Sequence, residues 1–373
     1  MYLEIPLSDA DITEQEISAV VEVLRSKRLA LGSKLTEFET KVAAYTGRKY
    51  ALAVNSGTSA LHLLVRALGL KHGDEVITTP FSFIASANCI LFEGATPVFV
   101  DIDENSLNID PNKIESAITS KTKALLIVDV FGHPANWLPI LEIARKHNLK
   151  IIEDSCEAIG AEYHGVKCGK FGDGATFAFY PNKQMTTCGE GGIIVTDDLE
   201  IADLCRSMHN QGRSVQHGKW LEHIRLGYNY RMTEVQAAMG IVQLARLEQF
   251  IEKRTQLAAR YNELLQSTGG VFTPHVHAGD KSSWFVYVII LNENYSRQNR
   301  DSILEKLRAG GIQCSNYFQC IHLQPFYREL FGYTAGLFPI AESISDRTIA
   351  LPFFNNLSDD QINYIINSLR ACL

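Results

Sequence analysis

The sequence predicts an α/β protein in which a large domain, built on a mostly parallel sheet covered by helices, precedes a smaller α+β domain. Between residues 51 and 196, short and almost continuously apolar runs alternate with helical patterns. Strands that are buried on both faces read in this way, because helices cover both sides of a parallel sheet. Beyond residue 250 that alternation stops, which indicates a second unit.

The first helix is expected over residues 13–27, where Thr13 and Glu16 form a capping box. A second helix is expected over residues 34–45, which place apolar side chains on one face. The alternating region then predicts strands at 51–54, 75–79, 97–102, 124–130, 150–154, 175–180 and 192–196, with helices at 60–68, 86–94, 111–118 and 137–147.

A long helix from about Glu234 carries the chain away from the sheet. It is followed by an expected strand at 283–291 and by helices at 301–311 and 358–370. We therefore predict a large domain over residues 1–245 and a small domain over residues 246–373, and we expect the first 12 residues or so to pack with the small domain.

Composition excludes several classes of protein. The net charge of −7 gives no basic surface for nucleic acid or for a membrane surface. No apolar run approaches the ~20 residues that span a bilayer, and the first residues do not read as a signal peptide. The eight cysteines are scattered without CxxC pairs, which predicts no metal site, no disulfide framework and a cytoplasmic location.

Two residues between positions 151 and 192 indicate the chemistry. Asp154 ends one expected strand and Lys183 follows the next, and a parallel sheet brings such strand ends to one edge, where ligands bind. Taken alone, Lys183 would be read as a surface lysine, because loop lysines are common. Asp154 alone reads equally as a helix N-cap. Together they suit pyridoxal phosphate: a lysine forms the Schiff base and an aspartate keeps the pyridine nitrogen protonated.

Two further segments fall at the same edge. Residues 55–59, Asn-Ser-Gly-Thr-Ser, lie between a strand and a helix and could bind a phosphate or simply cap that helix. Residues 80–88 place Phe81 and Phe83 after the next strand, where an aromatic ring could stack on a flat cofactor or belong to the core.

The ordered set of motifs resembles one family along nearly the whole chain. The motifs are NSGTSALH, TTPFSFIASAN, PVFVDID, IIEDSCEAIGAEYHG, FAFYPNKQMTT and LGYNYRMTEVQAAMG. They are similar to those of the DegT/DnrJ/EryC1/StrS family, pyridoxal-phosphate-dependent aminotransferases of fold type I that act mostly on nucleotide-linked keto sugars. The resemblance implies an aminotransferase that takes its amino group from an amino acid, by analogy L-glutamate, for a keto sugar, with a 4-keto-6-deoxyhexose preferred.

The resemblance also implies roles for individual residues. By this resemblance Lys183 would form the Schiff base and transfer the proton, Asp154 would contact the pyridine nitrogen, and Glu157 would lie near the cofactor O3′. Gly57 and Thr58 would bind the phosphate, and Phe83 would stack on the ring. Asn229 would reach the phosphate of the neighbouring subunit's cofactor, and His322 and Glu190 would border the sugar-nucleotide pocket. The active unit is accordingly expected to be a homodimer with shared active sites.

Two departures from the family pattern bear on the site. Ala178 replaces a serine that usually contacts the phosphate, and Cys188 reads as a one-residue insertion in the turn after Lys183, next to Glu190. A 3-keto sugar or a cyclitol ketone stays open as the substrate. A non-catalytic, cofactor-binding regulator is the alternative from another class, whereas the intact Lys183 argues against a sugar dehydratase.

Overall fold

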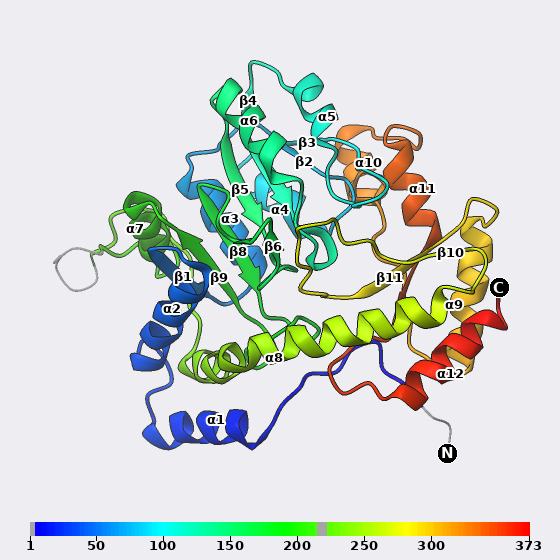
Figure 1. The fold of residues 1–373 in the computed structure, drawn as a ribbon. Coiled ribbons are helices and arrows are strands. Elements are labelled where there is room, and N and C mark those ends of the chain that lie inside the picture. The colour runs from blue at the N-terminus through cyan, green and yellow to red at the C-terminus, as the bar shows by residue number, and fades with distance from the viewer. Residues whose placement is uncertain (1–3, 215–221) are drawn as a thin grey trace.

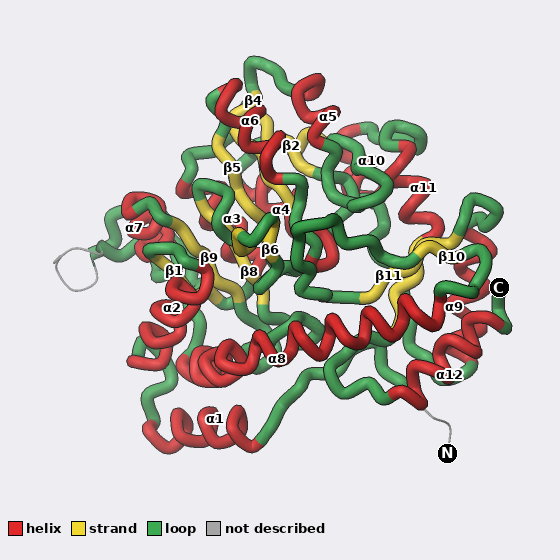
Figure 2. The backbone as a smooth tube through the Cα atoms, viewed as in Figure 1, coloured by secondary structure: helices red, strands yellow, loops and turns green. Residues whose placement is uncertain are grey.

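The structure is a computed structural model that describes residues 4–214 and 222–373. Figure 1 shows a large sheet wrapped by helices, and a second, smaller sheet to which the long helix α8 leads. In Figure 2 the strands form these separate groups, with red helices on the outside. The α/β class with a mostly parallel central sheet is therefore confirmed.

The large sheet has seven strands in the order β1-β9-β8-β5-β4-β2-β3. Every pairing is parallel except the two made by β9, which runs antiparallel to β1 and to β8. The strands are β1 (Tyr50–Val54), β2 (Glu75–Thr78), β3 (Thr96–Phe99), β4 (Thr122–Val128), β5 (Lys150–Asp154), β8 (Gly174–Ala178) and β9 (Gly192–Thr196).

Helices cover both faces of this sheet, as the unbroken apolar runs predicted. Successive side chains of a strand point to opposite faces, so Leu126 packs into the cluster with α3, α4 and α7, and Leu125 into the cluster with α5 and α6. A third cluster joins α2 and the first half of α8 to β1, β8 and β9. These helices are α2 (Ser33–Thr46), α3 (Gly57–Ala67), α4 (Ala85–Phe92), α5 (Pro111–Ile114), α6 (Trp137–His147), α7 (Leu199–Met208) and α8 (Glu234–Leu265).

The smaller sheet is antiparallel and has its own core. It has the order β10-β11-β12, and its cluster includes side chains from α8, α9 and α12. The remaining elements are β6 (Glu162–Tyr163), β7 (Val166–Lys167), β10 (Val271–Phe272), β11 (Tyr287–Leu291), β12 (Thr348–Leu351), α1 (Glu14–Ser26), α9 (Arg297–Ala309), α10 (Pro325–Phe331), α11 (Pro339–Arg347), α12 (Asp359–Arg370) and the 3₁₀ turns Glu115–Ala117, Val130–Gly132 and Ile321–Leu323.

The N-terminal segment lies against this second core. Ile5 is fully buried in it, donates its backbone N–H to Gly311 O and accepts a hydrogen bond from Gln313 N. Helix α8 crosses residue 245 without a break. The division of the chain into 1–245 and 246–373 therefore stays a prediction.

The expected strand at 283–291 is shorter in the structure, where β11 starts only at Tyr287. Before it, Ser283 N donates to Gly132 O and Phe285 N to Phe131 O, which replaces a β-ladder with a docked loop. The strand at 97–102 likewise ends at Phe99. Among residues 4–214 and 222–373, no helix combines the length and the apolar composition needed to cross a bilayer.

The start of α2 depends on a carboxylate from another helix. Its N-cap residue, Gly32, has no side chain to offer, and Glu234 at the start of α8 accepts the backbone N–H groups of Gly32, Lys34 and Leu35 at 2.9, 2.9 and 3.1 Å. Glu234 is only 3% exposed. This carboxylate replaces the missing cap and ties α8 to α2.

The Glu234→Ala variant should leave these three N–H groups without an acceptor and lower the free energy of unfolding by about 1–3 kcal/mol. Glu234→Gln keeps one side-chain oxygen and should lose less. Differential scanning calorimetry of both variants measures this, and an alanine variant with the wild-type melting temperature would contradict the capping role.

Candidate active site

A cavity of about 670 Å³ opens at the carboxyl ends of β4, β5 and β8. Asp154 ends β5, and in the sheet register it lies opposite Val128 of β4 and Thr176 of β8. Lys183 follows β8 in the turn that leads to β9. The parallel pairing therefore brings both residues to one cavity, as the sequence predicted, and both line it.

The Asp154 carboxylate is buried and held by two donors. Ser86 Oγ donates to Oδ2 at 2.7 Å and the backbone N–H of Cys156 donates to Oδ1 at 3.2 Å. Ser86 in turn is 2.9 Å from Ser82 Oγ. A carboxylate has about four lone-pair positions, so Asp154 can accept a further hydrogen bond from a ligand N–H in the cavity.

Lys183 extends into the cavity beside a second carboxylate. Its Nζ lies 3.4 Å from Glu157 Oε1, and its side chain is 12% exposed. The backbone N–H of Phe131 donates to the other oxygen, Glu157 Oε2, at 2.9 Å. Burial raises the pKa of Glu157, and the nearby Lys183 ammonium and the Phe131 N–H oppose that rise.

The N-terminus of α3 borders the other end of the cavity. Ser56 caps the helix by accepting from Ser59 N, and Ser56, Gly57 and Thr58 all line the cavity. A Cβ on Gly57 would lie 2.7 Å from the Ala178 Cβ and 3.0 Å from Cys156 Sγ. Glycine at this position therefore lets the start of α3 pack closely against β8, and N–H groups at a helix start can bind an anion.

Comparison with known proteins identifies the family. A model of the DegT/DnrJ/EryC1/StrS aminotransferase family matches residues 10–370. The chain belongs to this family. It is therefore a sugar aminotransferase that depends on pyridoxal phosphate, as its motifs predicted.

Individual relatives agree over their full lengths. GDP-perosamine synthase of Caulobacter vibrioides is 40% identical over 345 residues, 92% of this chain and 91% of that protein. The crystal structure of S. venezuelae DesV in complex with a ketimine intermediate has a TM-score of 0.92 and 34% identity, with 99% of this chain and 98% of that one covered. The structure of the putative sugar aminotransferase Spr1654 from Streptococcus pneumoniae, in its PLP-form, has a TM-score of 0.94 and 28% identity, with 99% of this chain and 98% of that one covered.

The residues present fit the cofactor of the family. A lysine amine, a buried carboxylate with an unused acceptor position and an open helix start line one cavity. These are the groups that an aldehyde, a pyridine nitrogen and a phosphate need.

Two other predicted residues, Phe83 and Glu190, also line the cavity. Phe83 is 60% exposed, so its ring has a free face, whereas Phe81 is fully buried in the core. The backbone oxygen of Glu190 accepts from Thr187 Oγ1 at 2.9 Å and from Gln236 Nε2 at 2.6 Å. These contacts hold the backbone of the turn at Glu190.

The inserted residue Cys188 is accommodated in that turn by a left-handed backbone, with φ +58°. Its N–H and Sγ lie 3.2 and 3.1 Å from Met239 Sδ on α8, and its side chain is not among those lining the cavity in the described part of the chain. Cys188 thus lies in the turn away from the cavity, and Lys183 lines the cavity.

Asn229 and His322 do not line this cavity among the described residues. Asn229 is exposed and pairs through its backbone with Asn210. His322 is fully buried, and its Nε2 lies 3.0 Å from Glu342 Oε1. Burial lowers the pKa of His322 despite that carboxylate. Their predicted roles, at a partner's phosphate and at the sugar nucleotide, stay predictions.

Sequence reasoning missed several cavity residues, among them Ser86, Phe285 and Tyr317. Ser86, which donates to Asp154, stands in the segment 80–88 that the strand-end argument already placed at this edge. Phe285 and Tyr317 come from the second half of the chain. Phe285 was assigned to the interior of a strand, so its pattern carried no signal of a site.

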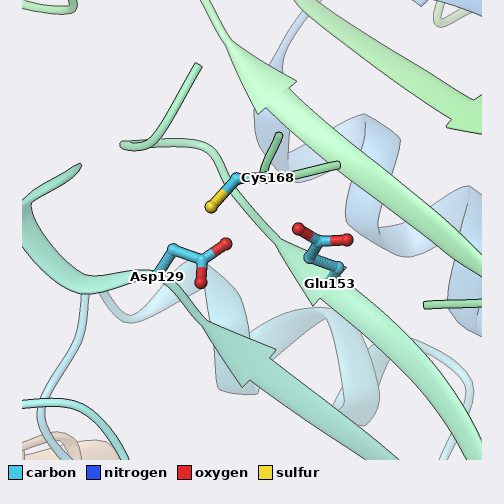
Figure 3. A group of neighbouring side chains, drawn as sticks. All are labelled: Asp129, Glu153 and Cys168. Atoms are coloured by element: carbon cyan, nitrogen blue, oxygen red, sulfur yellow. The ribbon is translucent and has the colours of Figure 1, made fainter. Parts of the chain in front are cut away.

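A buried network supports the turn that carries Asp154 and Glu157. Ser155 Oγ lies 2.6 Å from Asp129 Oδ2 and 3.1 Å from Glu153 Oε1, and all three residues are fully buried. Figure 3 shows Asp129 and Glu153 facing each other, with Cys168 beside them. A hydroxyl donates only one hydrogen bond, and burial raises the pKa of both carboxyls, so we infer that one of the two carries a proton.

The remaining contacts of this cluster are hydrogen bonds from the protein itself. Asp129 Oδ1 accepts Ala135 N and Trp137 Nε1, at 2.8 and 3.1 Å. Glu153 accepts the backbone N–H groups of Gly169 and Phe171. Burial, followed by the charge of Glu153, raises the pKa of Asp129 well above its usual range. These contacts indicate a structural network rather than a cation site.

The Asp129→Asn variant should be at least as stable as the wild type in alkaline buffer, because its amide donates to Ser155 as the protonated acid does. An acid with a raised folded-state pKa is protonated when folded and ionised when unfolded, so its contribution to stability falls as the pH rises from about 4 toward that pKa. Urea unfolding in mildly acidic and in alkaline buffer should therefore show that Asp129→Asn loses less stability between the two pH values than the wild type does.

Asp129→Ala is the matched comparison. It leaves the N–H groups of Ala135 and Trp137 without an acceptor and should lose about 1–3 kcal/mol at either pH. If the asparagine and alanine variants are destabilised equally relative to the wild type, the inference that one of the two carboxyls carries a proton is refuted.

Proposed function

We propose that this enzyme moves an amino group from L-glutamate to a nucleotide-linked keto sugar, preferably a 4-keto-6-deoxyhexose. The observation that carries the proposal is the convergence of Lys183 Nζ and the Asp154 carboxylate on one cavity bordered by the start of α3. Relatives that are named GDP-perosamine synthase in three bacteria support a nucleotide-linked sugar as the acceptor.

Each residue has one task in this reaction. Pyridoxal phosphate, when bound, supplies the electron sink that makes the substrate carbon acidic. Lys183 is the Schiff-base lysine, and its Nζ then takes a proton from the substrate carbon and returns one. Asp154 Oδ accepts a hydrogen bond from the protonated pyridine nitrogen, and Glu157 lies near the ring oxygen.

The binding residues orient the reacting groups. Gly57 and Thr58 at the start of α3 hold the phosphate, and Phe83 stacks on the ring from the open side of the cavity. Glu190 borders the substrate on the sugar side, and the resemblance assigns His322 to the same pocket, although its side chain is fully buried. The exposed Asn229 reaches the phosphate in a second copy of the chain, so the active form is a homodimer. The eight free cysteines fit the cytoplasm that we propose as its location.

The Lys183→Ala variant should lose amination of the keto sugar by about 10³-fold or more, because no other amine performs the proton transfer. Mass spectrometry of nucleotide sugars incubated with glutamate and holoenzyme detects the amino product. Lys71→Ala, at an exposed lysine outside the cavity lining, is the matched control.

The same assay ranks 4-keto sugars, 3-keto sugars and cyclitol ketones as acceptors. No product from any of these ketones with the wild-type holoenzyme would contradict the proposal and favour a cofactor-binding regulator.

The Ala178→Ser variant should bind pyridoxal phosphate about fivefold more tightly, because it adds one hydroxyl, worth about 1 kcal/mol, where the family contacts the phosphate. Fluorescence titration of the cofactor-free protein measures the affinity. Pyridoxal without phosphate is the control ligand and should bind equally to both proteins. An equal gain for both ligands would show that the serine acts elsewhere.

A further inference from the structure

The amine of Lys183 contacts two side chains. Its Nζ lies 3.4 Å from Glu157 Oε1 and 3.7 Å from the centroid of the Phe285 ring. Phe285 is 3% exposed and lines the cavity. Among the described residues, Glu157 is the one carboxylate that pairs with this amine.

Phe285 reaches this position from outside the large sheet. It belongs to the loop that precedes β11, and its backbone N–H donates to Phe131 O at 3.2 Å. The buried Arg254 of α8 donates from Nη1 to the carbonyl oxygens of Trp284 and Phe285, at 3.0 and 3.2 Å. The loop is thus fixed at both ends of the Phe285 peptide unit.

One residue, Phe131, binds both neighbours of the amine through its backbone. Its N–H donates to Glu157 and its C=O accepts from Phe285. It has a left-handed backbone with φ +60°, and Gly132 follows it at φ +86°. A Cβ on Gly132 would lie 2.9 Å from the backbone nitrogens of Trp284 and Phe285, so glycine is required for the loop to dock.

We propose that Phe285 is a positioning residue for Lys183: its ring and the Glu157 carboxylate hold the lysine amine between them whenever that amine is not bonded to the cofactor. The face of an aromatic ring attracts an ammonium group, and most strongly where water is excluded. This inference rests on the proposed role of Lys183. It adds that Phe285, from the second half of the chain, positions the Lys183 amine.

The other ionisable side chains that line the cavity do not share this contact. They are Asp154, Cys156, Tyr180, Glu190 and Tyr317. Of the described residues, only Glu157 and Phe285 contact the amine in an ion pair or a cation–π contact. Removing the ring therefore leaves one of two stabilising neighbours.

The test is the pH profile of Lys183 acylation by acetic anhydride in the full-length, cofactor-free protein, followed by peptide mass spectrometry with Lys71 as the internal reference. In Phe285→Leu the profile should move toward lower pH by about half to one unit, because the ammonium form loses the ring. At a fixed pH on the rising limb this is a roughly three- to tenfold faster reaction. The plateau at high pH should stay unchanged.

Three variants separate attraction from packing. Phe285→Tyr keeps the aromatic face and should keep the wild-type profile. Phe318→Leu makes the same substitution at another phenylalanine of the cavity wall and should leave the profile unchanged. If Phe285→Leu does not fold, Phe285→Met replaces it, and its profile is compared with that of Phe285→Tyr.

A wild-type profile in the folded leucine or methionine variant would overturn the proposal, as would a tyrosine variant that shifts equally. The readout needs neither cofactor nor substrate. Its failure therefore leaves the aminotransferase proposal standing, and a failure of the amination assay leaves this result interpretable.

Discussion

The parallel register of β4, β5 and β8 determines where every reactive side chain lies. Because Asp154 is level with Val128 and Thr176, the segments that follow these strands begin at one edge of the sheet. They supply the turn at Phe131, the acids after β5 and Lys183. A shift of one residue in this register would turn Asp154 from the cavity to the opposite face.

The electrostatic pattern of the cavity follows from that edge. Carboxylates from the end of β5 gather at one side, and the start of α3, with its unpaired N–H groups, borders the other. A ligand with a cationic ring nitrogen and an anionic phosphate matches both ends at once. The buried pair Asp129 and Glu153 keeps the intervening turn in place through Ser155, whose hydroxyl contacts both carboxyls.

Local patterns predicted much of this arrangement. Short, almost continuously apolar runs that alternate with helical patterns identified the strands of the large sheet, and strand ends then indicated Asp154, Lys183 and the start of α3. Helix starts were equally readable, as with Thr13, whose capping box is present in the structure. Each of these features depends on residues that are neighbours in the sequence or that lie in the same sheet.

The features that escaped prediction depend on contacts between distant segments. Phe285 meets Lys183 only because residues near 284 dock on Gly132 and on Arg254, at least 30 positions away in the chain. Glu234 caps α2 across 202 positions of sequence. An apolar run such as 283–286 satisfies a strand pattern and a docked loop equally well, so local pattern could not separate them.

The most direct test of the account is the site of cofactor attachment. Purified holoenzyme reduced with borohydride and digested should yield one modified peptide, with the cofactor's mass on Lys183, because borohydride fixes a lysine-bound aldehyde. The account predicts that this label is lost when excess glutamate is added before reduction. A label on another lysine, or none on protein saturated with pyridoxal phosphate, would contradict it.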